Sequence, residues 1–321
     1  MILGMIEHDR GVLEEASLQM LTFARELAGR MDAPLAALLV GKEARPLAEG
    51  LRAYGVARVF LAEDDRLSRY APEAWARAIL QLVEEKRPDV ILAAGTDRGN
   101  EVMGHAGAMA ALPVAANCSE MHPGDPFRVT RLRWGSSLIE EALLAGEPKL
   151  ATVALHVVEP EEGASPGEAT VEPFSPAFEE TDFRVRVKAL EETVTEGITL
   201  KTAPVVIGGG RGVGSEEGYS VLEELARLVG GAVGGSRVAT NNGWRPHADQ
   251  IGLTGNRIAP ELYIACGISG AIQHLVGCKG AKRILVINND PEAPFFSKAD
   301  YGVIGDLHEV LPAIIEELKK G

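Results

Sequence analysis

The stretch ELYIACGISGAIQH, residues 261–274, joins an apolar run to a segment of glycines and polar side chains. The apolar run has the length and character of a buried strand. Gly267 and Gly270 then favour a turn, and Ser269 is suited to cap the first turn of a following helix. The glutamine and histidine that end the stretch would lie in that turn. The stretch therefore predicts a strand that feeds a helix at the ligand-binding edge of a parallel sheet.

Strands and helices alternate along both halves of the chain. In the first half, the predicted strands cover 2–7, 35–41, 57–63 and 89–95, and the predicted helices cover 12–31, 46–55 and 72–88. The second half alternates again, from a strand over 204–210 to a helix over 310–320 that Asp306 and Glu309 open with a capping box. This pattern is typical of βαβ units, and nearly continuous apolar runs are typical of parallel strands.

The middle of the chain departs from this alternation. Residues 127–135, 137–146 and 149–160 are strand-like with few helices between them, which predicts an antiparallel addition to the first domain. The acidic stretch 159–173 is rich in Pro, Gly and Ser and predicts a loop.

We expect two α/β domains, each a mostly parallel sheet flanked by helices. A chain of 321 residues is long enough for two domains at roughly 100–200 residues each. We place the boundary before the apolar strand that opens the second half, so that residues 1–190 form an N-terminal domain and residues 191–321 form a Rossmann-like C-terminal domain.

Composition excludes several classes of function. Hydrophobic residues make up 46% of the chain and charged residues 24%, as in a globular protein with a sizeable core. A net charge of −14 and an aromatic content of 5% argue against nucleic acid binding. Cys118, Cys266 and Cys278 lie far apart without a CxxC motif, so we expect reduced thiols and no metal site. Since we find no signal peptide and no membrane-spanning run, we expect a bacterial-type cytoplasmic protein without membrane insertion.

A glycine-rich turn follows the first strand of the second half. Residues 206–218 read VIGGGRGVGSEEG, and the free amides of such a turn can hold a phosphate. The spacing does not match the GxGxxG fingerprint, and Ser236 and Arg237 stand where an acidic residue would bind a ribose. The mismatch argues against a standard NAD-binding domain. The segment can still be either an anion-binding loop or only a tight glycine turn. Arg211, in the middle of the turn, favours the anion.

Polar side chains also follow the other predicted strands. Thr254 lies between glycines in a long polar loop, and Asn288 and Asp306 each follow an apolar run. Since the carboxyl ends of parallel strands meet at one edge, we expect these side chains to gather there. For each of these groups a role without a ligand is the alternative. The polar loop can be a solvated surface loop, His274 can be structural, and Asp306 can serve only as a helix cap. Because the chain shows no nucleophile elbow, HExxH motif, Walker loop or paired carboxylates, we favour a cofactor that carries its own chemistry.

Residues 259–307, APELYIACGISGAIQHLVGCKGAKRILVINNDPEAPFFSKADYGVIGDL, resemble the flavin-binding signature of the electron transfer flavoprotein α subunit. The first half resembles that family in its order of elements and in ILAAGTDRGNEV, residues 91–102. The resemblance implies one FAD held mainly by the C-terminal domain at the interface with a β subunit. It also implies AMP in that β subunit and no ligand in the N-terminal domain. The acidic segment 191–197 then becomes a predicted hinge.

The family passes electrons from flavin dehydrogenases such as acyl-CoA dehydrogenase to the ETF-quinone oxidoreductase or to another acceptor. The resemblance therefore implies an electron carrier without substrate chemistry of its own. Whether such a redox flavoprotein counts as an enzyme stays open. Arg211 matches the arginine near the FAD phosphates. Ser236 and Arg237 match a pair whose arginine lies over the isoalloxazine ring, where a fixed cation favours the reduced anion.

Further roles follow from the same resemblance. Thr254 matches the threonine at flavin N5, and the resemblance implies that His274 lies near O2 and Gln273 near the ribityl chain. Asn288 and Asp306 match contacts to the adenosine end. The expected FAD contacts are Arg211, Ser236, Arg237, Ile251, Gly252, Leu253, Thr254, Ser269, Gly270, Ala271, Ile272, Gln273, His274, Asn288, Asp306 and Leu307. Among these, Leu253 replaces a glutamine that many relatives carry, so its side-chain contact is lost while a backbone contact can survive.

Four functions remain open, and we favour the electron carrier. A bifurcating relative would hold a second FAD in place of AMP in β and oxidise NADH. An ordinary flavin or nicotinamide dehydrogenase would act on a small molecule, against which the unmatched fingerprint and the missing acid–base pair argue. A non-redox binding subunit would have an empty site, against which the intact SR, SGAIQH and INND stretches argue.

Overall fold

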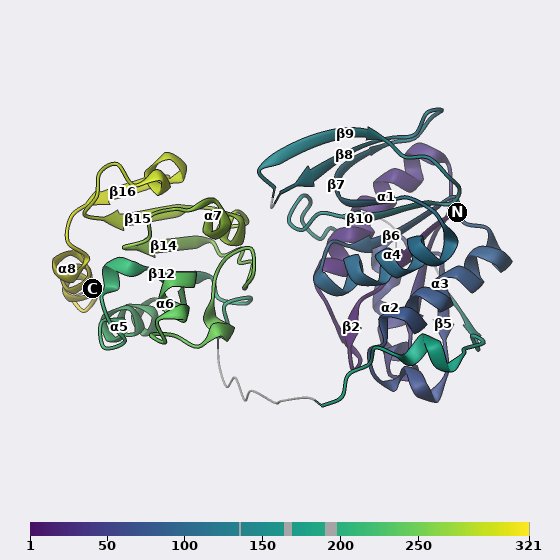
Figure 1. Cartoon of the computed structure of the whole chain (residues 1–321), viewed down its shortest axis with the longest axis horizontal. Coiled ribbons are helices and arrows are strands. Elements are labelled where there is room, and N and C mark those ends of the chain that lie inside the picture. The colour runs from purple at the N-terminus through teal and green to yellow at the C-terminus, as the bar shows by residue number, and fades with distance from the viewer. Residues whose placement is uncertain (135, 164–168, 190–197, 321) are drawn as a thin grey trace. The chain divides into compact units, whose positions relative to one another are not determined.

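The computed structural model describes residues 1–134, 136–163, 169–189 and 198–320 (Figure 1). Two compact units are distinct, one within residues 1–134 and 138–191 and the other mainly within residues 192–321. The predicted boundary between residues 190 and 191 and the predicted hinge over 191–197 lie outside the described residues. Among the described residues, no helix has the length and apolar character that a membrane span requires.

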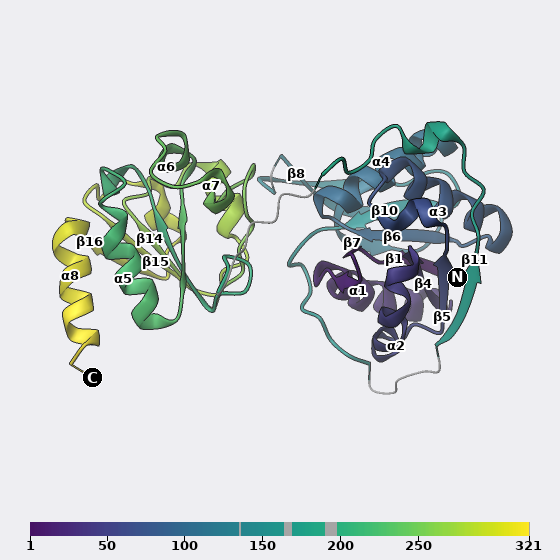
Figure 2. The same cartoon turned by 90° about the horizontal axis from the view of Figure 1, so that it is seen from below.

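A nine-stranded sheet forms the first unit (Figure 2). Its strands are β1 (Ile2–Met5), β4 (Leu35–Val40), β5 (Arg58–Ala62), β6 (Val90–Ala94), β7 (Val114–His122), β8 (Arg128–Arg133), β9 (Leu138–Leu143), β10 (Lys149–Val153) and β11 (Thr170–Phe174). Their order is β11-β5-β4-β1-β6-β10-β7-β8-β9. A separate antiparallel pair joins β2 (His8–Asp9) to β3 (Val12–Leu13).

The predicted antiparallel addition is confirmed for β8 and β9, which pair antiparallel with each other. β8 also pairs antiparallel with β7, a strand that was not predicted. The third predicted segment differs, because β10 lies between β6 and β7 and runs parallel to both. Nearly all of β10 is buried, as expected for an interior parallel strand covered on both faces. The loop predicted over 159–173 also ends in a strand, β11, because Val171 and Phe174 pack against the apolar clusters beside β5.

Helices cover both faces of this sheet. The helix α1 (Ala16–Met31) packs on one apolar cluster, and α3 (Pro72–Lys86) packs with α4 (Asp97–Ala110) on the other. The helix predicted over 46–55 is instead divided, because Pro46 and Gly50 weaken a continuous helix. The short elements are the 3₁₀ turns η1 (Lys42–Leu47), η2 (Arg52–Tyr54), η3 (Asp65–Ser68) and η4 (Glu180–Phe183), and the single turn α2 (Ala48–Leu51).

The second unit is a five-stranded parallel sheet, which agrees with the predicted Rossmann-like fold. Its strands are β12 (Val205–Gly209), β13 (Ala232–Gly235), β14 (Leu262–Cys266), β15 (Ile284–Asn288) and β16 (Tyr301–Ile304). Its helices are α5 (Tyr219–Val229), α6 (Arg237–Asn241), α7 (Ile272–Cys278) and α8 (Leu307–Leu318), with the 3₁₀ turns η5 (Arg211–Val213), η6 (His247–Asp249) and η7 (Pro294–Lys298).

The strand order β13-β12-β14-β15-β16 selects one place for a ligand. The chain leaves β12 for β13 on one side and then crosses to β14 on the other side of β12. Parallel α/β sheets bind ligands at such a switch point, beyond the carboxyl ends of the strands. One face of the sheet is covered by α5 and α8 and the other by Ile251, Ile258 and Phe295. The carboxyl edge is therefore where this fold offers a ligand site.

Candidate functional site

Two glycine loops meet at the switch point between β12 and β14. The amide of Gly210 donates to the carbonyl of Cys266 at 2.9 Å, and the amide of Gly212 donates to the carbonyl of Gly267 at 3.0 Å. A Cβ on Gly212 would lie 2.8 Å from the Cα of Gly267, whose φ is +61°. Only glycine permits this approach. The glycines thus bring two loops of the protein together, while Arg211 between them is exposed.

Two buried tyrosines hold the end of β12 from its opposite faces. A Cβ on Gly208 would lie 2.0 Å from the hydroxyl of Tyr263, and a Cβ on Gly209 would lie 2.6 Å from the hydroxyl of Tyr219. The Tyr219 hydroxyl also donates to the carbonyl of Gly209 at 2.8 Å. Neither tyrosine was among the predicted site residues, although consecutive glycines at the end of a strand indicate a close approach of other groups.

The neighbouring strand β13 leads to Ser236 and Arg237. The buried Ser236 hydroxyl accepts from the amide of Ala239 at 3.4 Å and so caps α6. Arg237, the first residue of α6, is exposed, as is Arg211. Among the residues that the structure describes, neither arginine side chain has an ion pair or a hydrogen bond. In a chain with a net charge of −14, two unpaired cations at one sheet edge favour an anionic ligand.

The loop that carries Thr254 is attached to the sheet and to α7. The amide of Ile251 donates to the carbonyl of Gly235 at 2.8 Å, and the amide of Leu253 donates to the carbonyl of Gln273 at 2.7 Å. The Leu253 amide is therefore already used within the protein. Only the carbonyl group of the Leu253 backbone therefore remains to make the predicted contact with FAD.

This loop also touches α7 through two glycines. A Cβ on Gly277 would lie 2.2 Å from the amide nitrogen of Gly252. Ile251 and Gly252 are buried, whereas Leu253 and Thr254 are exposed at the edge. The loop thus presents Thr254 from a backbone that packing holds in place.

A side-chain amide stands behind Thr254. The Thr254 hydroxyl accepts from the Gln250 amide nitrogen at 2.9 Å, and the Gln250 amide oxygen accepts from the Thr240 hydroxyl at 3.1 Å. Neither Gln250 nor Thr240 was among the predicted site residues. Two features of the sequence indicate them: Gln250 directly precedes the IGLTG segment, and Thr240 lies one helical turn after Ser236.

The start of α7 differs from the prediction. The helix begins at Ile272 with Ala271 at the N-cap and no side-chain capping bond, so the prediction that Ser269 caps it was wrong. The reason is Gly270, whose φ of +87° turns the chain before the helix can begin. The carbonyl of Ser269 instead accepts from the amide of Phe295 at 3.1 Å. Ser269 and the residues 271–273 remain exposed at the edge.

His274 lies behind this exposed turn. It is 7% exposed, and its Nε2 lies 2.8 Å from the hydroxyl of Tyr263. Burial lowers the pKa of His274 to about 4, against a smaller opposing effect of the Ile251 backbone, so the ring is neutral at neutral pH. Among the described residues, its buried Nδ1 has no hydrogen-bond partner.

Asn288 ends β15 and is buried. Its amide nitrogen donates to the carbonyl of Ile268 at 3.0 Å, and its amide oxygen accepts from the amide of Asp290 at 3.0 Å. Asn288 thus ties the end of β15 to the loop that follows β14.

Asp306 and Leu307 follow β16. The carboxylate of Asp306 accepts from the amide of His308 at 2.9 Å, which confirms the predicted helix cap. The described contacts of Asp306 include no reciprocal bond from Glu309, so the predicted capping box is not formed. Leu307 is buried, and its methyl group would lie 2.9 Å from a Cβ on Gly267, so it packs beneath the glycine crossing.

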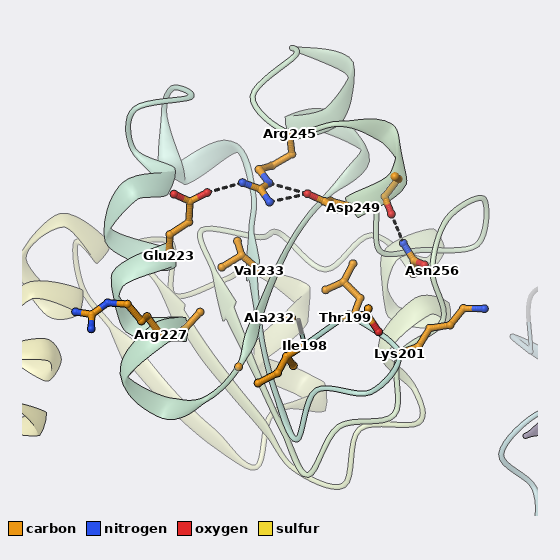
Figure 3. A pocket seen from close by; sticks show the side chains of 14 residues that line it. Ile198, Thr199, Lys201, Glu223, Arg227, Ala232, Val233, Arg245, Asp249 and Asn256 are labelled. Atoms are coloured by element: carbon orange, nitrogen blue, oxygen red, sulfur yellow. Dashed lines mark hydrogen bonds and ion pairs between the residues drawn. The ribbon is translucent and has the colours of Figure 1, made fainter. Parts of the chain in front are cut away.

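A pocket of about 600 Å³ lies elsewhere in the second unit, beside the outer strand β13 (Figure 3). Arg245 lines it and bonds to both Glu223 and Asp249 at 2.6 Å. Lys201 and Arg227 lie at its sides. The predicted site residues are absent from its lining among the described residues. We therefore place the candidate site at the carboxyl edge, where the predicted residues gather.

Comparison with protein families divides the chain into the same two halves. The model of the electron transfer flavoprotein domain matches residues 2–179, and the model of the electron transfer flavoprotein FAD-binding domain matches residues 199–279. The second match spans Arg211 to His274 but not Asn288, Asp306 and Leu307.

Relatives match over nearly their full length. The electron transfer flavoprotein subunit alpha of Mycobacterium tuberculosis is 37% identical, with 99% of this chain and 98% of the relative covered. The subunit alpha of Megasphaera elsdenii is 34% identical, with 98% and 95% covered. That of Thermoanaerobacterium thermosaccharolyticum is 33% identical, with 98% and 96% covered.

Proposed function

Because the chain belongs to the α-subunit family of electron transfer flavoproteins, we propose that its second unit holds FAD at the carboxyl edge of the sheet and carries electrons between proteins. The family pairs this subunit with a β subunit, and the chain carries its FAD-binding domain. We further propose that AMP occupies the β subunit. Flavin dehydrogenases such as acyl-CoA dehydrogenase would donate the electrons, and the ETF-quinone oxidoreductase or another acceptor would receive them.

The observation that carries this proposal is the pair of unpaired arginines beside the switch point. When bound, FAD supplies a ring that takes up and releases electrons, joined to adenosine by a diphosphate. Arg211 on the glycine crossing is suited to the diphosphate. Arg237 at the end of β13 is suited to the negative charge that the ring gains on reduction.

The residues around the two arginines would orient the cofactor and take no part in a reaction of their own. Thr254 offers a hydroxyl whose oxygen already accepts a bond, which leaves its proton for a ligand acceptor. The neutral His274 brings no charge to the edge. This agrees with a site in which the protein binds and tunes the cofactor without acid–base chemistry of its own.

The test is to purify the chain with its β subunit, release the bound nucleotides and count them. We expect one FAD and one AMP per heterodimer. Two FAD and no AMP would indicate the bifurcating type, in which NADH is oxidised directly. No flavin after incubation with excess FAD would contradict the proposal.

Matched variants locate the site. The double variant Arg211→Ala, Arg237→Ala should retain less FAD because both free cations are lost. Arg227→Ala removes an exposed arginine of the same unit beside the pocket of Figure 3 and should retain FAD fully. Equal loss in both variants would contradict a site at the carboxyl edge.

A further inference from the structure

A chain of hydrogen bonds runs behind the carboxyl edge from α6 to Thr254. The Thr240 hydroxyl oxygen lies 3.2 Å from the carbonyl oxygen of Arg237 and 3.1 Å from the amide oxygen of Gln250. The amide nitrogen of Gln250 lies 2.9 Å from the Thr254 hydroxyl oxygen. The chain thus joins two predicted FAD contacts, Arg237 and Thr254, through two residues to which the resemblance gave no role.

Burial makes these bonds obligatory. Thr240 is 3% exposed and Gln250 is 6% exposed, so an amide or hydroxyl left unpaired there would lose its bonds to water without compensation. The backbone on either side is also fixed. The amide of Gln250 donates to the carbonyl of His247 at 3.1 Å, and the amide of Asn256 donates to the carbonyl of Gln250 at 2.6 Å. The side-chain amide of Gln250 is therefore held at one place with a partner at each end.

The same positions admit two directions of hydrogen bonding. In the first, Thr240 donates to the Gln250 oxygen, and the Gln250 nitrogen donates to Thr254, whose proton then points out of the chain. In the second, the amide of Gln250 is turned over. Its nitrogen donates to Thr240, Thr240 donates to the carbonyl of Arg237, and Thr254 donates to the Gln250 oxygen. The two ends of an amide are nearly equal in shape, so both arrangements fit the same space.

We propose that Gln250 and Thr240 are positioning residues that set the direction of the Thr254 hydroxyl toward the N5 atom of bound FAD. The inference rests on the proposed function. In the first arrangement Thr254 donates outward, and in the second its oxygen accepts. N5 of a flavin accepts a hydrogen bond when unprotonated and donates one when protonated. A reversible chain lets one threonine match both forms without leaving a buried group unpaired.

The first experiment is a double-mutant cycle with Gln250→Met and Thr254→Val in the full chain with its β subunit. We measure urea unfolding of the flavin-free protein and the dissociation constant of oxidised FAD for all four proteins. Gln250→Met alone should weaken FAD about tenfold, as for the loss of one oriented hydrogen bond. In the Thr254→Val background the same change should have little effect, because Gln250 acts through that hydroxyl.

A matched control separates orientation from loosening of the loop. Asn256 holds the same loop through bonds to the carbonyls of Ala248 and Gln250 at 2.6 and 3.1 Å, and it has no bond to the Thr254 hydroxyl. The effect of Asn256→Ala on FAD should therefore be the same with and without Thr254→Val. If Gln250→Met behaves like this control, it has only a structural role and the proposal is wrong.

Thr240→Val tests the reversal. It removes one bond from each arrangement, because the Gln250 oxygen loses its donor in the first and the Gln250 nitrogen loses its acceptor in the second. A buried N–H without an acceptor is tolerated less well than an under-used carbonyl oxygen, so the variant should favour the first. We expect a lower reduction potential of the bound flavin with the affinity for oxidised FAD retained. An unchanged or raised potential would overturn the reversible chain.

Failure of the proposed function is distinguishable from failure of this inference. Without any FAD binding, the proposed function fails, while coupling between Gln250 and Thr254 in unfolding still reports their bond. No coupling in unfolding overturns the inference whatever the flavin content. In protein that binds FAD, coupling in unfolding without coupling in FAD binding overturns it as well.

Discussion

Single residues at the carboxyl edge differ in whether their polar groups are already used. Asn288 and Ser236 are buried and bonded within the protein, so they hold loops in place. Arg211 and Arg237 are exposed and, within the described residues, unpaired. The electrostatic character of the edge therefore depends on these two arginines and on the exposed carboxylate of Asp306.

Arg237→Ala should lower the reduction potential of the bound flavin. A unit charge about 5 Å from a developing negative charge contributes roughly 3 kcal/mol at an effective dielectric constant of about 20. We expect a loss of this order or less, measured by equilibrium reduction with reference dyes. Arg237→Lys keeps the charge and should recover most of the potential. An unchanged potential in Arg237→Ala would remove this residue from the proposed role.

His274 should make the second unit sensitive to acid. Its pKa is lowered by burial to about 4 in the folded protein, against an ordinary value of 6.5. Between these values the unfolded chain binds the proton and the folded protein does not, so stability falls as the pH falls. One such group lowers the free energy of unfolding by up to about 3 kcal/mol at pH 4.

The measurement is urea unfolding at pH 7 and pH 5, followed by the hydrogen-exchange protection of peptides from the second unit, because the fluorescence of Trp244 overlaps with that of Trp75 and Trp134 in the first unit. His274→Asn should reduce the loss of stability between the two pH values. Since burial also lowers the pKa of His8 in the first unit, His8→Asn provides a control that should leave the transition of the second unit unchanged. Equal pH dependence in wild type and His274→Asn would contradict the assignment.

At the scale of elements, close contacts between glycine backbones hold α7 against the loop before β14. Gly277 lies against Gly252, and the glycine loops after β12 and β14 cross at Gly212 and Gly267. These contacts join segments that the sheet alone would not bring together. They leave Thr254 and residues 271–273 facing outward.

Gly277→Ala should therefore displace the loop that carries Thr254. A Cβ there would lie 2.2 Å from the amide nitrogen of Gly252, and overpacking of this kind typically costs about 1–3 kcal/mol. We expect lower stability of the second unit and weaker FAD retention, measured by urea unfolding and flavin release. Gly104→Ala, in a helix with open space at the Cβ, should be neutral or stabilising. Similar losses in both variants would contradict the contact.

For the molecule as a whole, the two units have separate sheets and separate cores. The proposed FAD residues all belong to the second unit. A ligand that binds one folded unit stabilises that unit by mass action, about 2.7 kcal/mol at a concentration one hundred times the dissociation constant.

Hydrogen exchange of the heterodimer with and without FAD tests this division. Peptides from β12, β14 and α7 should gain protection with FAD, and peptides from β1, β4 and β6 should not. Peptides from α5, on the covered face of the same sheet, indicate how far the effect spreads. Gains concentrated in the first unit would contradict a site confined to the second.

The order of apolar and polar residues was enough to predict the alternation of strands and helices, the parallel character of both sheets and the strand ends at which polar residues stand. The helix predicted over 72–88 is α3, Pro72–Lys86, and Asp306 caps α8 as predicted. These features depend on periodicity and capping, which act between residues a few positions apart. The sequence pattern was therefore sufficient to find them.

Three features could be found only in the packed fold: the place of β10, the start of α7 beyond Ser269 and the bonds that join Thr240, Gln250 and Thr254. Each depends on contacts between distant segments, as where β10 inserts between β6 and β7 or where Gly270 meets Phe295. Local propensity carries no information about which segments meet, because burial and hydrogen-bond pairing are settled by the packed sheet as a whole.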